Sequence, residues 1–170
     1  MSATPRKRFR DMGRALTIAA VIFLVAPVCF ADGLSDGLAA YDRGDYRVAL
    51  EEWQGAAAEG NAAAMNAIAG LYDQGHGVGR DPAMAAKWYR RSAERGNTVG
   101  QLNLGDMYSL GAGVPLDRSE AYVWLSLAAA QGNAWSADKK LKIAAAMTAG
   151  NIAAANLRYE ALKNRLPISP

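Results

Sequence analysis

The fold is decided by residues 98–133, which read TVGQLNLGDMYSLGAGVPLDRSEAYVWLSLAAAQGN. Residues 62–97 follow the same plan and read AAAMNAIAGLYDQGHGVGRDPAMAAKWYRRSAERGN. When these two units and a shorter one before them are aligned, single residue types recur every 36 residues. Such a period is typical of a repeat array, in which each unit buries its apolar face by stacking on the next. The recurring columns are Asp45, Asp81 and Asp117; Ala49, Ala85 and Ala121; Ala57, Ala93 and Ala129; Gly60, Gly96 and Gly132; and Asn61, Asn97 and Asn133.

Each unit is predicted to form two helices, because its apolar residues recur at spacings of three and four. Gly60 is expected to end a helix and Asn61 to cap the next one. Asp81 offers another N-cap, and Asp117 with Glu120 three residues later resembles a capping box. No strand pattern is present. The recurring aromatic residues are interpreted as core, namely Trp53, Tyr72, Trp88, Tyr89, Tyr108 and Trp124.

The N-terminal segment does not belong to the array. Basic residues between Arg6 and Arg14 precede an apolar run over residues 15–28, and Cys29-Phe30-Ala31 follows it. This layout predicts a secretory signal peptide over residues 1–31, cleaved after Ala31. The run is shorter than the roughly 20 residues that cross a bilayer. A retained membrane anchor is the alternative interpretation.

Removal of that segment changes the charge and the cysteine count. The whole chain has 19 basic and 16 acidic residues, a net charge of +3. Residues 1–31 hold five of the basic residues and one acidic residue, so residues 32–170 carry a net charge of −1. The basic excess therefore does not indicate nucleic-acid binding, which needs cations in the folded domain. Cys29 also leaves with the segment, so no disulfide or thiol chemistry is expected.

The two full units resemble the Sel-one-like repeat (SLR) family, which is related to tetratricopeptide repeats. The resemblance rests on the pattern Leu104-Gly105-x-Met107-Tyr108-x-x-Gly111-x-Gly113-Val114, followed by Asp117, Ala121 and Trp124. The unit before it matches through Ile68-Ala69-x-Leu71-Tyr72-x-x-Gly75-x-Gly77-Val78. The first unit has a shorter loop and is closer to a plain tetratricopeptide pair. The predicted division is 1–31 signal peptide, 32–61 tetratricopeptide-like helix pair, 62–97 and 98–133 SLR repeats, and 134–170 capping helices.

The resemblance implies an all-α fold, a right-handed α-α superhelix of stacked antiparallel helix pairs with C-terminal capping helices. It also implies a scaffold or adaptor that has no reaction of its own, needs no cofactor and binds a protein or peptide on its concave face. The first helix of each pair lines that face in the family. With the signal segment, this predicts a periplasmic or secreted protein of a bacterial envelope, attached to a membrane only through that segment.

The residues offer little for catalysis. His76 is the only histidine, and with no second histidine or remaining cysteine it is interpreted as an exposed loop residue, not a metal ligand. The glycines around it lack the preceding strand and the Gly-Lys-Ser/Thr ending of a phosphate loop. Glu51 and Glu52 are adjacent, so on a helix they point about 100° apart and cannot face one substrate.

A run of charged residues between Lys87 and Arg95 follows helical spacing. One interpretation is a basic stripe for an acidic partner. The other, which we favour, is a solvated helix face with Arg90 and Glu94 placed for an i,i+4 ion pair.

The predicted binding face follows from placing Tyr72 and Tyr108 at the helix–helix contact. Neighbouring positions then rotate toward the inner curve. They form a mixed surface that suits a helix or an extended peptide with some basic character. The candidate residues are Ala63, Asn66, Gly70, Asp73, Val99, Leu102, Asn103, Asp106 and Ser109, with Trp135, Asp138 and Lys139 extending the groove.

Two other functions remain open from the sequence. One is a membrane-tethered structural protein of the envelope whose apolar N-terminus stays uncut. The other is an enzyme that acts on the cell wall, which the absence of a placed acid/base pair disfavours.

Overall fold

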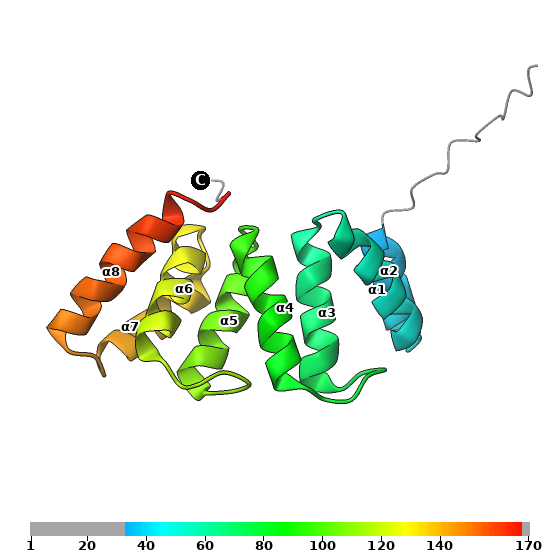
Figure 1. Ribbon diagram of the computed structural model, residues 1–170, viewed down its shortest axis with the longest axis horizontal. Helices are drawn as coiled ribbons and strands as arrows, with labels where there is room; N and C mark the ends of the chain where they lie inside the picture. Colours follow the sequence, from blue (N-terminus) through cyan, green and yellow to red (C-terminus); the bar gives the residue numbers. More distant parts are fainter. Residues whose placement is uncertain (1–32, 168–170) are drawn as a thin grey trace, which may run out of the picture.

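The computed structural model describes residues 33–167, and within that range the chain consists of eight helices with no strand. The helices pair in chain order and stack into an elongated array, with α1 and α2 at one end and α7 and α8 at the other (Figure 1). The second helix of each pair packs on the first helix of the next. This confirms the predicted all-α stack of helix pairs. The helices are α1 (Gly33–Asp42), α2 (Tyr46–Ala58), α3 (Ala62–Gln74), α4 (Pro82–Glu94), α5 (Thr98–Leu110), α6 (Arg118–Ala130), α7 (Ala134–Ala144) and α8 (Ala149–Lys163).

The recurring asparagines start the first helix of each following pair. The side chains of Asn61, Asn97 and Asn133 accept hydrogen bonds from backbone amides three residues ahead, at 3.0, 2.7 and 2.8 Å. Each bond satisfies an amide that would otherwise have no partner in the first helical turn. The asparagine column is therefore explained by capping, as predicted for Asn61.

The aspartate column behaves less uniformly. Asp81 and Asp117 cap α4 and α6 through their side chains, whereas Asp45 makes no side-chain cap and pairs with Arg43 at 3.2 Å. The predicted capping box at Asp117 is only half right. Glu120 does not reach back to the Asp117 amide, which donates to the Tyr108 carbonyl. Instead the Glu120 carboxylate accepts from Trp124 Nε1 and pairs with Arg158.

The loops between paired helices stack each unit on the one before it. Gly77 and Gly113, 36 residues apart, both have positive φ angles, +69° and +70°. A Cβ on Gly77 would lie 2.5 Å from Cβ of Tyr46, at the start of α2. A Cβ on Gly113 would overlap the carbonyl of Pro82, at the start of α4. The second glycine of each loop therefore lets one unit's loop approach the second helix of the preceding unit.

The apolar core runs along the stack as two adjoining clusters. Trp53, Tyr89, Tyr108 and Trp124 are buried, which confirms their predicted core role. Tyr72 and Trp88 are half-buried and contact both clusters, so they join the first half of the stack to the second. Alanines from every repeat fill the remaining contacts and allow the helices to approach closely.

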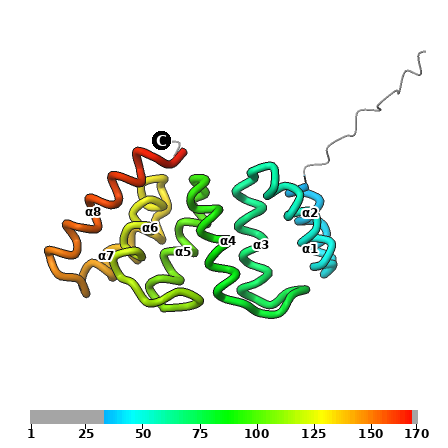
Figure 2. The backbone as a smooth tube through the Cα atoms, in the orientation of Figure 1, coloured from blue at the N-terminus to red at the C-terminus, as the bar shows by residue number. Residues whose placement is uncertain are grey.

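The last pair departs from the plan of the others. The smooth trace in Figure 2 shows α8 leaning over α6, and α8 packs against α6 far more than against α7. None of the helices in residues 33–167 combines the length and the apolarity needed to cross a membrane. The predicted signal peptide concerns residues 1–31, which lie outside the described part of the chain.

Candidate functional site

Several predicted binding residues lie on one face formed by the first helices of successive pairs. Asn103 Nδ2 on α5 donates to Asn66 Oδ1 on α3 at 3.2 Å. The Lys139 ammonium on α7 donates to the Asp106 carboxylate on α5. These two bonds tie α3, α5 and α7 together through side chains that the sequence had grouped. The three helices therefore present a continuous polar strip.

A hollow of about 330 Å³ opens on this strip between α3, α4 and α5. Three predicted residues line it, one from α3 and two from α5, together with the buried ring of Tyr89 and the base of a loop. Its volume is within the range of small-ligand pockets, and it can take a long side chain. The lining residues are Asp73, Arg80, Tyr89, Asn103, Asp106, Met107, Leu110 and Ala112.

A second hollow of about 250 Å³ adjoins the first between α5 and α7. Ser109 and Lys139 line it, with Leu110, Lys142 and Ile143. Leu110 borders both hollows and is 76% exposed. The two hollows therefore form one groove, which we call the α3/α5/α7 groove.

The other predicted residues do not line either hollow. Ala63, Asn66, Gly70 and Leu102 are half-buried on α3 and α5. Asp138 pairs with Lys142 one turn further along α7, at 2.6 Å. Val99 and Trp135 occupy equivalent repeat positions and are 47% and 67% exposed. Both side chains lie in the first turn of their helices, α5 and α7, outside the two hollows.

Sequence reasoning missed Arg80, Leu110 and Lys142. Arg80 Nε donates to the Asp73 carbonyl at 2.8 Å, which fixes the loop after α3 beside the first hollow. Leu110 is the last residue of α5, and its exposure next to Gly111 is unusual for leucine. A leucine directly before the loop glycine is a signal that could have marked it.

The Asp106 carboxylate is only partly satisfied. One oxygen accepts from Lys139, while Oδ1 is buried and has no hydrogen-bond partner among the described residues. A buried acceptor without a donor costs free energy, commonly about 1–3 kcal/mol. Because Oδ1 is closed to solvent, a donor on a bound ligand would reach it only after the Asp106 or Lys139 side chain rotates.

A family model for the Sel1 repeat matches residues 62–97 and 98–133. The chain contains two Sel1 repeats. Sel1-repeat proteins are generally scaffolds for protein–protein interactions and generally lack enzymatic activity. A comparison with curated proteins finds no match.

Two solved structures support this assignment. One is c5321 of uropathogenic Escherichia coli, a protective antigen displaying an SLR fold, with 27% identity, a TM-score of 0.74, and coverage of 78% of this chain. The other is a Sel1 repeat protein from Oxalobacter formigenes, with 34% identity, a TM-score of 0.61, and coverage of 63% of this chain. The matches cover 29% and 44% of those chains, so this chain spans less than half of either relative.

The histidine in the loop of the first Sel1 repeat is not the exposed loop residue that the sequence predicted. His76 is half-buried, its Nδ1 is hydrogen-bonded to the Tyr41 hydroxyl at 3.0 Å, and its ring stacks on Tyr46 with centroids 4.7 Å apart. It thus joins the Sel1 loop to the preceding helix pair. In residues 33–167 no three histidine, cysteine or acidic side chains are grouped closely enough to hold a metal ion.

The predicted Arg90–Glu94 ion pair is also wrong. The Arg90 guanidinium donates to the Tyr108 hydroxyl and lies 5.5 Å from the centre of that ring. Because this contact joins α4 of the first Sel1 repeat to α5 of the second, Arg90 stabilises the stack instead of belonging to a solvated outer face.

The ionisation of Tyr89 can be used to test the electrostatic environment of the first hollow. Burial, and then the negative charge of Asp73, raise the pKa of Tyr89 to about 12. A raised folded-state pKa means that the folded chain holds its proton more tightly than the unfolded chain. Stability is therefore expected to fall as the pH rises from 10 to 12. Urea denaturation should show a shallower fall for Tyr89→Phe, and identical slopes would contradict the assigned environment.

Proposed function

We propose that the chain is an exported scaffold that binds a partner protein or peptide along the α3/α5/α7 groove. The observation that carries the proposal is the pair of hollows that meet at the exposed Leu110, at the C-terminal end of α5, while the exposed Val99 and Trp135 lie in the first turns of α5 and α7. Exposed apolar anchors surrounded by polar groups are the usual composition of a binding surface. The general scaffold role of Sel1-repeat proteins supports the same function.

The groove favours an extended peptide or a helix that brings a hydrogen-bond donor to Asp106. Rotation of the Asp106 or Lys139 side chain would open the buried, unpartnered Oδ1, which would then suit a lysine, arginine or amide group on the ligand. An apolar ligand side chain can cover Leu110, where the two hollows meet. Trp135, with the Lys139 ammonium 5.7 Å from its ring centre, offers a second apolar contact at the start of α7.

Export is supported by the layout of residues 1–31, with its basic start, apolar run and small residues before Asp32. A scaffold released by cleavage at that point would act in the periplasm or outside the cell. Retention of the same segment would place the groove at a membrane surface.

Site-specific photo-crosslinking tests the proposal. A photoreactive amino acid at Leu110 or Trp135 should capture the same partner band in cells that express the full chain. The same probe at Glu94, an exposed residue of α4 outside the groove, serves as the matched control. Asp106→Lys should remove most of the capture at Leu110, since it places a cation where the groove has an acceptor. The mass of the purified protein in the same experiment shows whether the chain begins at Asp32.

Two results would count against groove binding. Capture at Glu94 as strong as at Leu110 would move the interface to another face. Undiminished capture by the Asp106→Lys variant would mean that the Asp106 carboxylate does not contribute to partner binding.

A further inference from the structure

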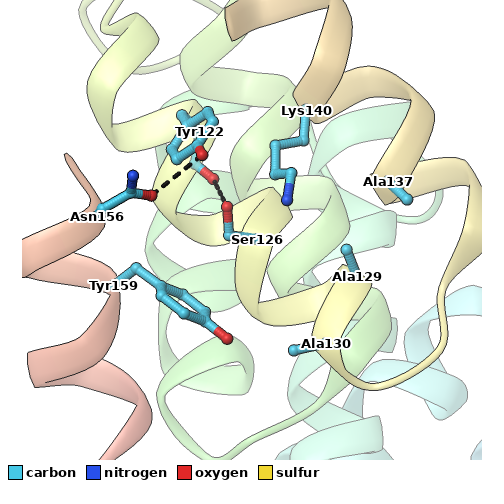
Figure 3. Close-up of a pocket in the computed structure, with 8 residues that line it drawn as sticks. All are labelled: Tyr122, Ser126, Ala129, Ala130, Ala137, Lys140, Asn156 and Tyr159. Carbon is cyan, nitrogen blue, oxygen red and sulfur yellow. Dashed lines mark hydrogen bonds between the residues drawn. The ribbon is translucent and has the colours of Figure 1, made fainter. Parts of the chain in front are cut away.

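A separate open cavity of about 390 Å³ lies on the other side of α7, bordered by α6, α7 and α8 (Figure 3). Lys139 of α7 faces the α3/α5/α7 groove, whereas the next residue, Lys140, lines this cavity. The cavity is therefore distinct from the proposed protein-binding groove.

The cavity exists because α8 is held on α6 and not along α7. The Tyr122 hydroxyl donates to Asn156 Oδ1 at 3.1 Å, and Arg158 pairs with Glu120 at 2.8 Å. Both bonds join α6 to α8. Three alanines, Ala129 and Ala130 of α6 and Ala137 of α7, line the space that remains and leave room between the larger side chains around it.

Two polar groups of the cavity are already paired, since Tyr122 donates to Asn156 Oδ1 and Ser126 donates to the Tyr122 carbonyl, which leaves Lys140 and Tyr159 as the groups that a ligand can meet. Figure 3 shows the Lys140 amine and the Tyr159 hydroxyl extending into the space between the helices. Lys140 is half-buried, lies 5.8 Å from the centre of the Tyr122 ring, and forms no ion pair with any carboxylate in residues 33–167. No acidic residue lines the cavity.

Two further cations lie on α8 near the cavity, and one of them, Arg158, is compensated by Glu120. The Lys163 ammonium lies 5.6 Å from the centre of the Tyr159 ring, and Arg158 projects from the same helix. A partly desolvated ammonium is stabilised when an anion enters its neighbourhood. Cationic ligands and metal ions are disfavoured for the same reason.

We propose that this cavity binds the carboxylate or phosphate group of a small ligand whose body is planar or apolar. The Lys140 ammonium meets the anion, the Tyr159 hydroxyl donates to it, and the Tyr122 ring packs against the body of the ligand. Aromatic rings favour planar partners in offset or edge contacts. The volume suits a ligand of this kind.

Titration of the protein, produced from the full chain, with benzoate and phenyl phosphate tests the proposal. Benzoate is expected to bind with a Kd of about 1 mM, because a ligand with few atoms makes few contacts. Benzamide, its neutral counterpart, is expected to bind at least ~10-fold more weakly, because the ion pair is missing. Tyrosine ring signals in nuclear magnetic resonance spectra measure occupancy directly.

Lys87, an exposed lysine of α4, offers a matched control for Lys140. Lys140→Gln should weaken benzoate binding ~10-fold or more, whereas Lys87→Gln should change it less than ~2-fold, since Lys87 lies outside this cavity and outside the α3/α5/α7 groove. Ala137→Phe should fill the cavity and abolish binding while the helical circular dichroism is kept. Equal effects of the two lysine variants would overturn the proposal. So would benzamide binding as tightly as benzoate, or no binding at tens of millimolar ligand.

A third arm distinguishes the two sources of such an anion. A short peptide ending in phenylalanine with a free carboxylate is compared with its amidated form and with benzoate. Binding of the free peptide much tighter than benzoate indicates a carboxylate carried by a polypeptide. Similar affinities indicate a free small molecule. Photo-crosslinking at Leu110 should be unaffected by Lys140→Gln, so failure of one proposal leaves the other standing.

Discussion

Gly113→Ala is expected to lower the free energy of unfolding by about 3 kcal/mol, one of the largest effects of any single methyl group in this chain. Two costs combine at this position. Alanine is strained at a φ of +70°, by roughly 1–2 kcal/mol. Its Cβ would also overlap the backbone of Pro82 and Ala83, at the start of α4. Backbone cannot move aside as a flexible side chain can, so one Sel1 loop must lift off the preceding repeat.

Gly132→Ala is the matched control for this substitution. Gly132 has a φ of +86° and no heavy atom within 4 Å of an added Cβ. It therefore carries the backbone strain alone, about 1 kcal/mol. Urea denaturation followed by circular dichroism compares the two midpoints. If both variants lost the same stability, the loop would not contribute to stacking.

The first glycine of each loop, Gly75 or Gly111, could be predicted from turn chemistry. The close contact that requires the second glycine, Gly77 or Gly113, could not. The sequence shows that residues 75–79 and 111–113 are rich in glycine and that they join two helices. It does not show that Gly77 meets Tyr46 or that Gly113 meets Pro82, because those neighbours are about 31 residues away and depend on how the units stack. The 36-residue period predicted that the units stack, and the geometry of that stacking determines which residues the second glycine contacts.

The residues of the α3/α5/α7 groove likewise divide into those that the sequence predicted and those that it did not. Helical spacing within each of the two units placed Asp73, Asn103 and Asp106 on a shared face, and the structure brings them to one hollow. Arg80 and Leu110 escaped prediction because a loop conformation and a helix end decide their positions. The pairing of Asp106 with Lys139 joins residues of different units, so it depends on packing that no local pattern contains.

The C-terminal cap, α7 and α8, differs most from the sequence-based prediction, and Glu120 and Arg158 account for the difference. Glu120 occupies the repeat position that Met84 holds in the preceding unit. From the sequence alone, Glu120 is assigned to a capping box, because its spacing from Asp117 fits that motif. Arg158, far along the chain, takes the carboxylate instead and draws α8 onto α6.

Trp124→Ala is expected to cost about 4 kcal/mol, whereas Trp88→Ala should cost about half as much. The two tryptophans occupy the same repeat position, 36 residues apart. Trp124 is only 2% exposed and donates through Nε1 to Glu120 at 3.2 Å. Trp88 is half-buried, and the Arg91 guanidinium lies 4.3 Å from its ring centre. Truncating Trp124 therefore leaves a cavity and also removes a donor from a buried carboxylate, whereas Trp88→Ala removes partly solvated surface.

Trp124→Phe separates the two contributions, because it keeps most of the ring volume and removes the hydrogen bond. We expect Trp124→Phe to lose about 1–2 kcal/mol, the usual cost of leaving one buried acceptor short of a donor. Denaturation midpoints of the three variants rank these effects. Equal losses for Trp124→Ala and Trp88→Ala would mean that neither the deeper burial of Trp124 nor its hydrogen bond to Glu120 adds to stability. The expected inequality follows from position in the array. A residue of a terminal repeat is buried only when something other than another repeat covers it, and here Glu120 and Arg158 hold the covering helix in place.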